Sequence, residues 1–150
     1  YTIASRAIPA GVAYFGTSSN EVIAVDNAAK KVRWRFEDPD RQFPFYSSAA
    51  LSSGLVVLGG RDKNVHAIDA ATGKRRWSFM TRARVDSSPA IAGDRVVVGS
   101  GDGKLYVLDL KTGKKVWEFE AGGAITASPA ISGGRIIIGD TDGRVYGIGQ

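Results

Sequence analysis

The chain has 150 residues, 43% of them hydrophobic, which is enough to build a core. It carries 20 Lys and Arg against 15 Asp and Glu, and it has no cysteine, so disulfides and thiolate chemistry are excluded. It contains no apolar run long enough for a membrane-spanning helix. Because it begins at Tyr1, without an initiator Met or a signal-like segment, we expect a mature or excised piece.

One sequence pattern recurs along the whole chain. Its copies begin at Ala4, Ser47, Ser87 and Ala127, and the last copy stops at Gln150. A fixed period of about 40 residues on strand-like units is typical of repeat architectures. Corresponding glycines follow at intervals of 43, 40 and 40 residues: Gly16, Gly59, Gly99 and Gly139.

The third copy shows four strand signals separated by turns. Residues 88–92 come first, and residues 95–99 (RVVVG) form a continuous apolar run, as expected for a strand covered on both faces. The Asp-Gly step at 102–103 indicates a hairpin that leads into residues 104–109. Residues 116–120 alternate between apolar and polar side chains, as in a half-exposed outer strand.

Four antiparallel strands in each repeat make one small sheet that must be covered on both faces. Radial stacking of such sheets achieves this and leaves only short, protected edges. The sequence therefore predicts an all-β protein, a β-propeller of four-stranded antiparallel blades. The chain holds three full blades and most of a fourth, which lacks its outer strand, over residues 4–43, 44–83, 84–123 and 124–150.

A second motif within the repeat carries a family resemblance. Residues 67–77 (AIDAATGKRRW) read Ala-x-Asp-x-x-Thr-Gly-x-x-x-Trp, residues 107–117 differ only in Val107, and residues 24–34 have Ala29 and Lys30 in place of Thr-Gly. This resembles the tryptophan-docking motif of the PQQ-like (quinoprotein-type) propeller repeats. The expected docking residues are Ala24, Asp26, Trp34, Ala67, Asp69, Thr72, Gly73, Trp77, Asp109, Thr112, Gly113 and Trp117.

The resemblance implies that each indole pins one sheet to the next, so we expect Trp77 and Trp117 to be buried. Members of that family usually have seven or eight blades. The chain is accordingly expected to be part of a larger ring, or a half-ring that pairs with another copy. A small ring of four blades is the alternative.

Two inter-blade links suggest a surface for a protein partner. Residues 37–46 concentrate aromatic and charged side chains, a composition typical of protein interfaces, and residues 81–86 are basic. The alternative is that the aromatic side chains pack down over the channel. The candidate surface residues are Arg41, Phe43, Phe45, Tyr46, Arg82 and Arg84.

The sequence offers no catalytic, cofactor-binding or metal-ligating set. His66 occupies a strand position where other copies have Ile23, Tyr106 and Tyr146, so we expect it in the core. Residues 140–143 (DTDG) resemble the start of a calcium loop but lack its later Glu, which favours a hairpin turn. The basic residues are spread over every repeat, so nucleic-acid binding is not favoured.

Two functions stay open. The first is a non-enzymatic scaffold for protein–protein interaction, either a sensor-type module or a protein similar to the BamB-like outer-membrane assembly propellers, which implies a periplasmic or otherwise exported location. The second is a fragment of a PQQ-dependent quinoprotein dehydrogenase whose active-site residues lie outside this segment. The fold does not decide between them.

Overall fold

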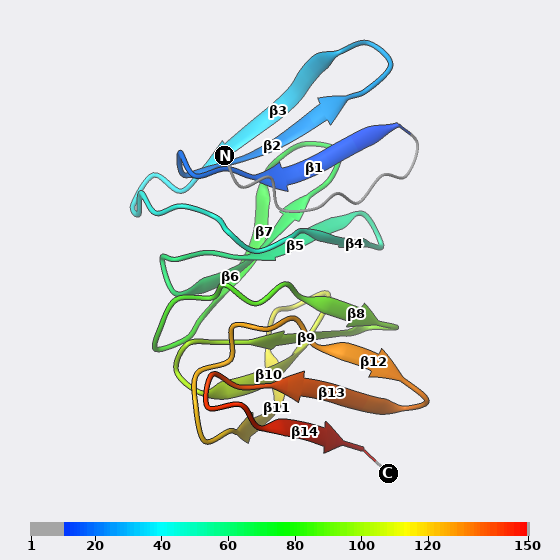
Figure 1. Ribbon diagram of the computed structural model, residues 1–150. Coiled ribbons are helices and arrows are strands. Elements are labelled where there is room, and N and C mark those ends of the chain that lie inside the picture. Colours follow the sequence, from blue (N-terminus) through cyan, green and yellow to red (C-terminus); the bar gives the residue numbers. More distant parts are fainter. Residues whose placement is uncertain (1–10, 150) are drawn as a thin grey trace.

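The computed structural model describes residues 11–149, which form four antiparallel β-sheets stacked one behind another (Figure 1). None of these residues is helical, so they contain no helix that could cross a membrane. The strands are β1 (Val12–Gly16), β2 (Glu21–Asp26), β3 (Lys31–Glu37), β4 (Ala50–Ser52), β5 (Leu55–Gly59), β6 (Asn64–Asp69), β7 (Arg75–Met80), β8 (Ala90–Ala92), β9 (Arg95–Gly99), β10 (Lys104–Asp109), β11 (Lys115–Glu120), β12 (Ala130–Ser132), β13 (Arg135–Gly139) and β14 (Val145–Ile148).

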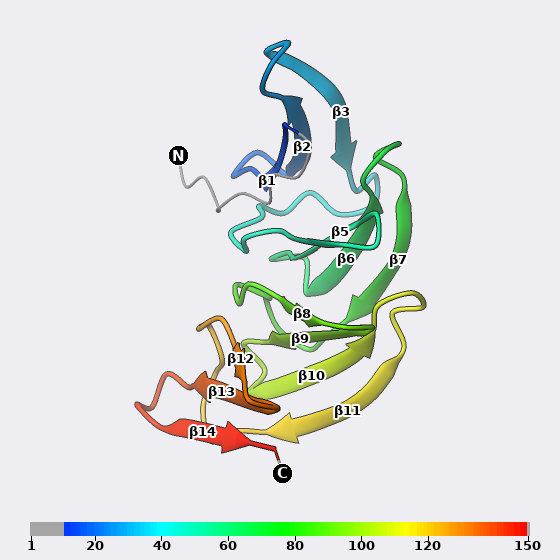
Figure 2. The same ribbon diagram turned by 90° about the vertical axis from the view of Figure 1, so that its right-hand side faces the viewer.

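Each sheet is one blade, with its strands in chain order. The second blade pairs β4-β5-β6-β7 and the third pairs β8-β9-β10-β11, so the predicted all-β, four-stranded blades are confirmed. The fourth blade pairs β12-β13-β14 and shows no outer strand among the described residues. The first blade shows β1-β2-β3, and its expected inner strand falls in residues 1–10, outside the described part of the chain. Figure 2 shows the outer strands β3, β7 and β11 along one side of the stack.

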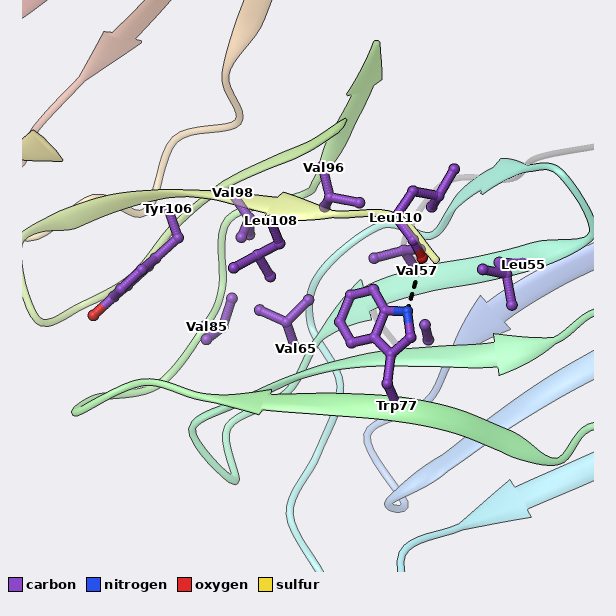
Figure 3. Packing of buried hydrophobic residues seen from close by; sticks show 11 residues of the cluster. Leu55, Val57, Val65, Trp77, Val85, Val96, Val98, Tyr106, Leu108 and Leu110 are labelled. Carbon is purple, nitrogen blue, oxygen red and sulfur yellow. Dashed lines mark hydrogen bonds between the residues drawn. The ribbon is translucent and has the colours of Figure 1, made fainter. Parts of the chain in front are cut away.

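The hydrophobic core lies between neighbouring sheets. Val57 and Val65 of the second blade pack against Val96, Val98 and Leu108 of the third, all at most 3% exposed (Figure 3). Similar clusters join the first blade to the second and the third to the fourth. Because no sheet has a core of its own, stability comes from stacking, as in other repeat proteins.

Each link between blades inserts one apolar side chain into the stack. Phe45, Val85 and Ile125 occupy equivalent positions and are 2%, 0% and 0% exposed. The backbone N–H of each donates a hydrogen bond of 3.0 Å to a carbonyl in the hairpin of the preceding blade. The space for each side chain exists because the strand beside it ends in glycine, where a Cβ would overlap the inserted residue. These glycines are Gly16, Gly59 and Gly99.

Gly99→Ala is expected to lower the free energy of unfolding by about 1–3 kcal/mol, because the added methyl group overlaps the fully buried Ile125 side chain. Urea denaturation followed by circular dichroism measures the loss. The matched control is Gly147→Ala, since a Cβ on Gly147 meets no atom within 4 Å. An equal loss in both variants would contradict this account of the glycine.

Two of the three tryptophans contact the following blade. Trp77 on β7 is 9% exposed, and its indole N–H donates to the Leu110 carbonyl at 2.8 Å (Figure 3). Trp34 makes the equivalent bond at 2.9 Å. Gly73 and Gly113 have φ of 76° and 72°, and a Cβ on either would overlap the indole above it. The Thr-Gly turn thus needs glycine for both its dihedral and the close approach.

The aspartate of the motif organises the same turn. Asp109 Oδ1 accepts hydrogen bonds from the backbone N–H groups of Thr112 and Lys111, both at 2.9 Å. The Thr112 bond is the main cause that holds the pKa of Asp109 below its ordinary value. Asp69 and Asp26 accept two backbone bonds in the same way, and their pKa values are lowered for the same reason.

Trp117 departs from the expectation that it is buried. It is 43% exposed and stacks on Phe119 with ring centroids 6.3 Å apart. By the 40-residue spacing, the carbonyl that corresponds to those of Ala70 and Leu110 belongs to Gln150, which lies outside the described residues. The indole therefore has no docking turn among residues 11–149.

Candidate functional site

The inter-blade links and one set of hairpins lie on the same face of the stack, which we call the loop face. In an antiparallel blade, the second-to-third-strand hairpin and the link to the next blade leave the sheet at the same end. The loop face thus comprises the links 38–49, 81–89 and 121–129 and the hairpins 17–20, 60–63, 100–103 and 140–143. It lies on the left in Figure 1.

The loop face contains a basic groove of about 510 Å³. Arg61 and Lys63 reach it from the second-blade hairpin, and Arg82 and Arg84 from the link that follows. The remaining lining is small, and it comprises Ala83, Gly101, Ala124, Thr126 and Thr141. Four cationic side chains in one concave surface raise the local positive potential and favour an anionic ligand.

Only part of this charge is neutralised within the chain. Asp86 accepts hydrogen bonds from Arg61 at 3.0 and 3.1 Å and forms an ion pair with Arg84 at 3.3 Å. Arg61 also lies over the Tyr46 ring, 4.2 Å from its centroid. Among residues 11–149, the Lys63 and Arg82 side chains form no ion pair. The groove therefore keeps an excess of positive charge.

The residues expected to form a partner surface differ in their exposure to solvent. Arg41, Phe43, Arg82 and Arg84 are exposed, and Tyr46 is half-buried. Arg82 and Arg84 line the groove, and Arg41 donates to the Asp62 carbonyl at 3.1 Å, which fixes the first link against the hairpin of Arg61 and Lys63.

The expectation that Phe45 belongs to the partner surface is wrong. It is 2% exposed and belongs to the core between the first two blades, because Gly16 leaves space for its ring. It therefore cannot contact a partner. Sequence reasoning also missed Arg61 and Lys63, although they stand where the next repeat has Gly101 and Gly103, a substitution of small residues by basic ones that could have signalled a binding role.

Beside the groove, a buried polar cluster joins the first link to the second blade. Asp38, Asp62 and His66 offer ligand atoms within 4.8 Å of one another, a spacing that could suit a metal ion. Most of these groups are already paired, although His66 Nδ1 is buried without a hydrogen-bond partner among residues 11–149. Asp38 forms an ion pair with Arg75 at 2.7 Å, while Asp62 accepts from His66 Nε2 at 2.7 Å and from the Asn64 backbone at 3.0 Å.

These pairings favour a structural role for the cluster. Burial alone would raise the pKa of Asp62, but the hydrogen bonds from His66 and Asn64 outweigh it, and the pKa lies below its ordinary value. His66 is fully buried between the rings of Phe36 and Phe45, with centroids at 5.9 and 5.6 Å. Tyr106 makes the corresponding bond to Asp102 in the third blade, at 2.6 Å.

Comparisons with known proteins agree with this architecture. The family model described as outer membrane protein assembly factor BamB matches residues 18–149. The crystal structure of BamB from Moraxella catarrhalis superposes with a TM-score of 0.83 and 25% identity, over 93% of this chain and 43% of BamB. This chain thus spans less than half of that BamB. No curated protein matches the sequence.

Two computationally designed proteins share the fold. Ika8 has a TM-score of 0.83 and 19% identity, over 99% of this chain and 46% of its own. Ika4 has a TM-score of 0.84 and 19% identity, over 98% of this chain and 90% of its own. At this identity the likeness concerns the fold alone.

Proposed function

Because this chain belongs to the family of the outer membrane protein assembly factor BamB, we propose that it is a non-enzymatic scaffold that binds a protein partner through its loop face. The observation that carries the proposal is the basic groove, where Arg61, Lys63, Arg82 and Arg84 converge from two separate loops. A periplasmic location and a role in outer-membrane protein assembly follow from the family as parts of the same proposal.

The composition of the loop face supports a protein ligand. Arginine and aromatic side chains are enriched in the energetically dominant parts of protein interfaces. Here exposed Phe43 and half-buried Tyr46 lie on the link next to the groove, and Tyr46 supports Arg61 by stacking. The expected partner segment is acidic, with carboxylates that pair bidentately with the guanidinium groups of Arg82 and Arg84.

A photo-crosslinking residue tests the proposal in the cells that produce the protein. Placed at position 84, it should trap a protein of the outer-membrane assembly machinery, identified by mass spectrometry. The matched control is position 114, an exposed lysine in a turn at the other end of the blades. Arg82→Glu with Arg84→Glu should reduce trapping from position 43 at least about tenfold without changing the melting temperature. Equal trapping from positions 84 and 114 would overturn the proposal.

A further inference from the structure

The fourth blade has an uncovered apolar face, which we call the forward face. Ile137 and Val145 are 47% and 75% exposed. At the equivalent positions of the third blade, Val97 and Leu105 are 3% and 0% exposed, because the fourth blade covers them. The second blade shows the same burial, with Val57 and Val65 covered by the third. The three equivalent interfaces within the chain therefore show what normally covers this face.

The covering surface is always the rear face of the next blade. In the second blade it consists of Val56, Leu58 and Ile68 and in the third of Val96, Val98 and Leu108, all 0% exposed. The strand register places the same positions of the first blade at Ala13, Phe15 and Val25. All three are apolar, so the first blade carries a rear face of the same chemistry.

Phe15 and Val25 are half-buried, whereas the equivalent side chains of the second and third blades are fully buried. The first and fourth blades stand at opposite ends of the stack in both views, so residues 11–149 do not bring these two faces together (Figures 1 and 2). A large exposed apolar surface of this kind marks an interaction site.

We propose that a second copy of this chain covers the forward face with the rear face of its first blade. The contact repeats the interface already made three times within the chain, with Ile137 and Val145 taking the places of Val97 and Leu105. The second copy presents its own forward face to the first blade of the first copy. The contact is head-to-tail and each copy supplies four sheets, so two copies joined at both pairs of faces form a closed ring of eight sheets.

The oligomeric state tests this directly. Sedimentation velocity at concentrations up to about 100 μM should give twice the mass of one chain. Val145→Arg should give a folded monomer, since an arginine in the interface core is left without a partner. Val116→Lys is the matched control: Val116 is 49% exposed at a position occupied in the second blade by exposed Arg76, so this variant should stay dimeric.

A mixing experiment identifies the two faces. Val25→Arg should also be monomeric, but an equimolar mixture with Val145→Arg should form a heterodimer, because one intact forward face and one intact rear face remain. Circular dichroism checks that each variant is folded. A monomeric parent chain over the whole concentration range overturns the proposal. So does a folded, dimeric Val25→Arg variant, which would show that two forward faces pair with each other.

Discussion

Phe45→Ala should lower the free energy of unfolding by about 3–5 kcal/mol, the range for removing a large aromatic side chain from a core. The Phe45 ring is 2% exposed and packs in the core between the first two blades, over Gly16 and beside the His66 ring at 5.6 Å. The cavity left by the ring stays unfilled on the side of Gly16, because glycine has no side chain that could move into it. Urea denaturation followed by far-ultraviolet circular dichroism measures the loss.

The control for this variant lies two residues away on the same link. Phe43 is 49% exposed, so Phe43→Ala should change stability by less than about 0.5 kcal/mol, as surface substitutions usually do. The two variants also separate folding from binding, since Phe43 stays available to a partner and Phe45 does not. If both alanine variants unfold at the same urea concentration, Phe45 is not the residue that joins the two blades.

Trp77→Ala is expected to have a similar effect, about 3–5 kcal/mol. The variant loses the indole packing on Gly113 and the 2.8 Å bond to the Leu110 carbonyl, and the Leu110 oxygen is left buried without this partner. Because this contact joins the second and third blades, the cooperativity of unfolding should fall as well, which a broader transition would reveal.

Trp117→Ala tests the same tryptophan position in the next copy of the motif. Trp117 is 43% exposed, so its removal should cost less than about 1 kcal/mol. The sequence alone predicts equal effects at the two positions, because both motifs are nearly complete. Equal measured losses would show that Trp117 is also covered in solution. Measuring Trp117→Ala in the Val145→Arg background would then show whether dimer formation contributes to that cover.

The lowered pKa values of Asp69 and Asp109 make the stability of the docking turns depend on pH in the acid range. Both pKa values are lowered by hydrogen bonds that exist only in the folded chain, so the stability they contribute is present at neutral pH. It is lost as the pH falls through these lowered values.

Much of the fold can be predicted from short-range patterns in the sequence. The strands of the third blade agree within two residues with the segments expected from apolar runs and turn residues, because period-two patterning and Asp-Gly hairpins act over few residues. The Asp109 turn could likewise be predicted, since its hydrogen bonds reach only two or three residues along the chain.

Only half of the proposed binding surface could be predicted from the sequence. Arg82 and Arg84 stand out as a basic link, but Arg61 and Lys63 join them only because the 60–63 hairpin folds against that link. Phe43 and Phe45 have the same side chain on the same link, and only comparison with the later links, which have Val85 and Ile125 at the position of Phe45, separates the buried ring from the exposed one. Gly16, distant in sequence, decides which ring is inserted.

The sequence by itself determined the repeat, the four sheets and the turns that join them, because each depends on hydrogen bonds and side-chain alternation within about 40 residues. Only the tertiary structure decided which aromatic side chain of the first link is buried, which cations share a groove and which tryptophan is left exposed. Each of those outcomes depends on contacts between residues that are distant in sequence, which the local pattern of one blade does not specify.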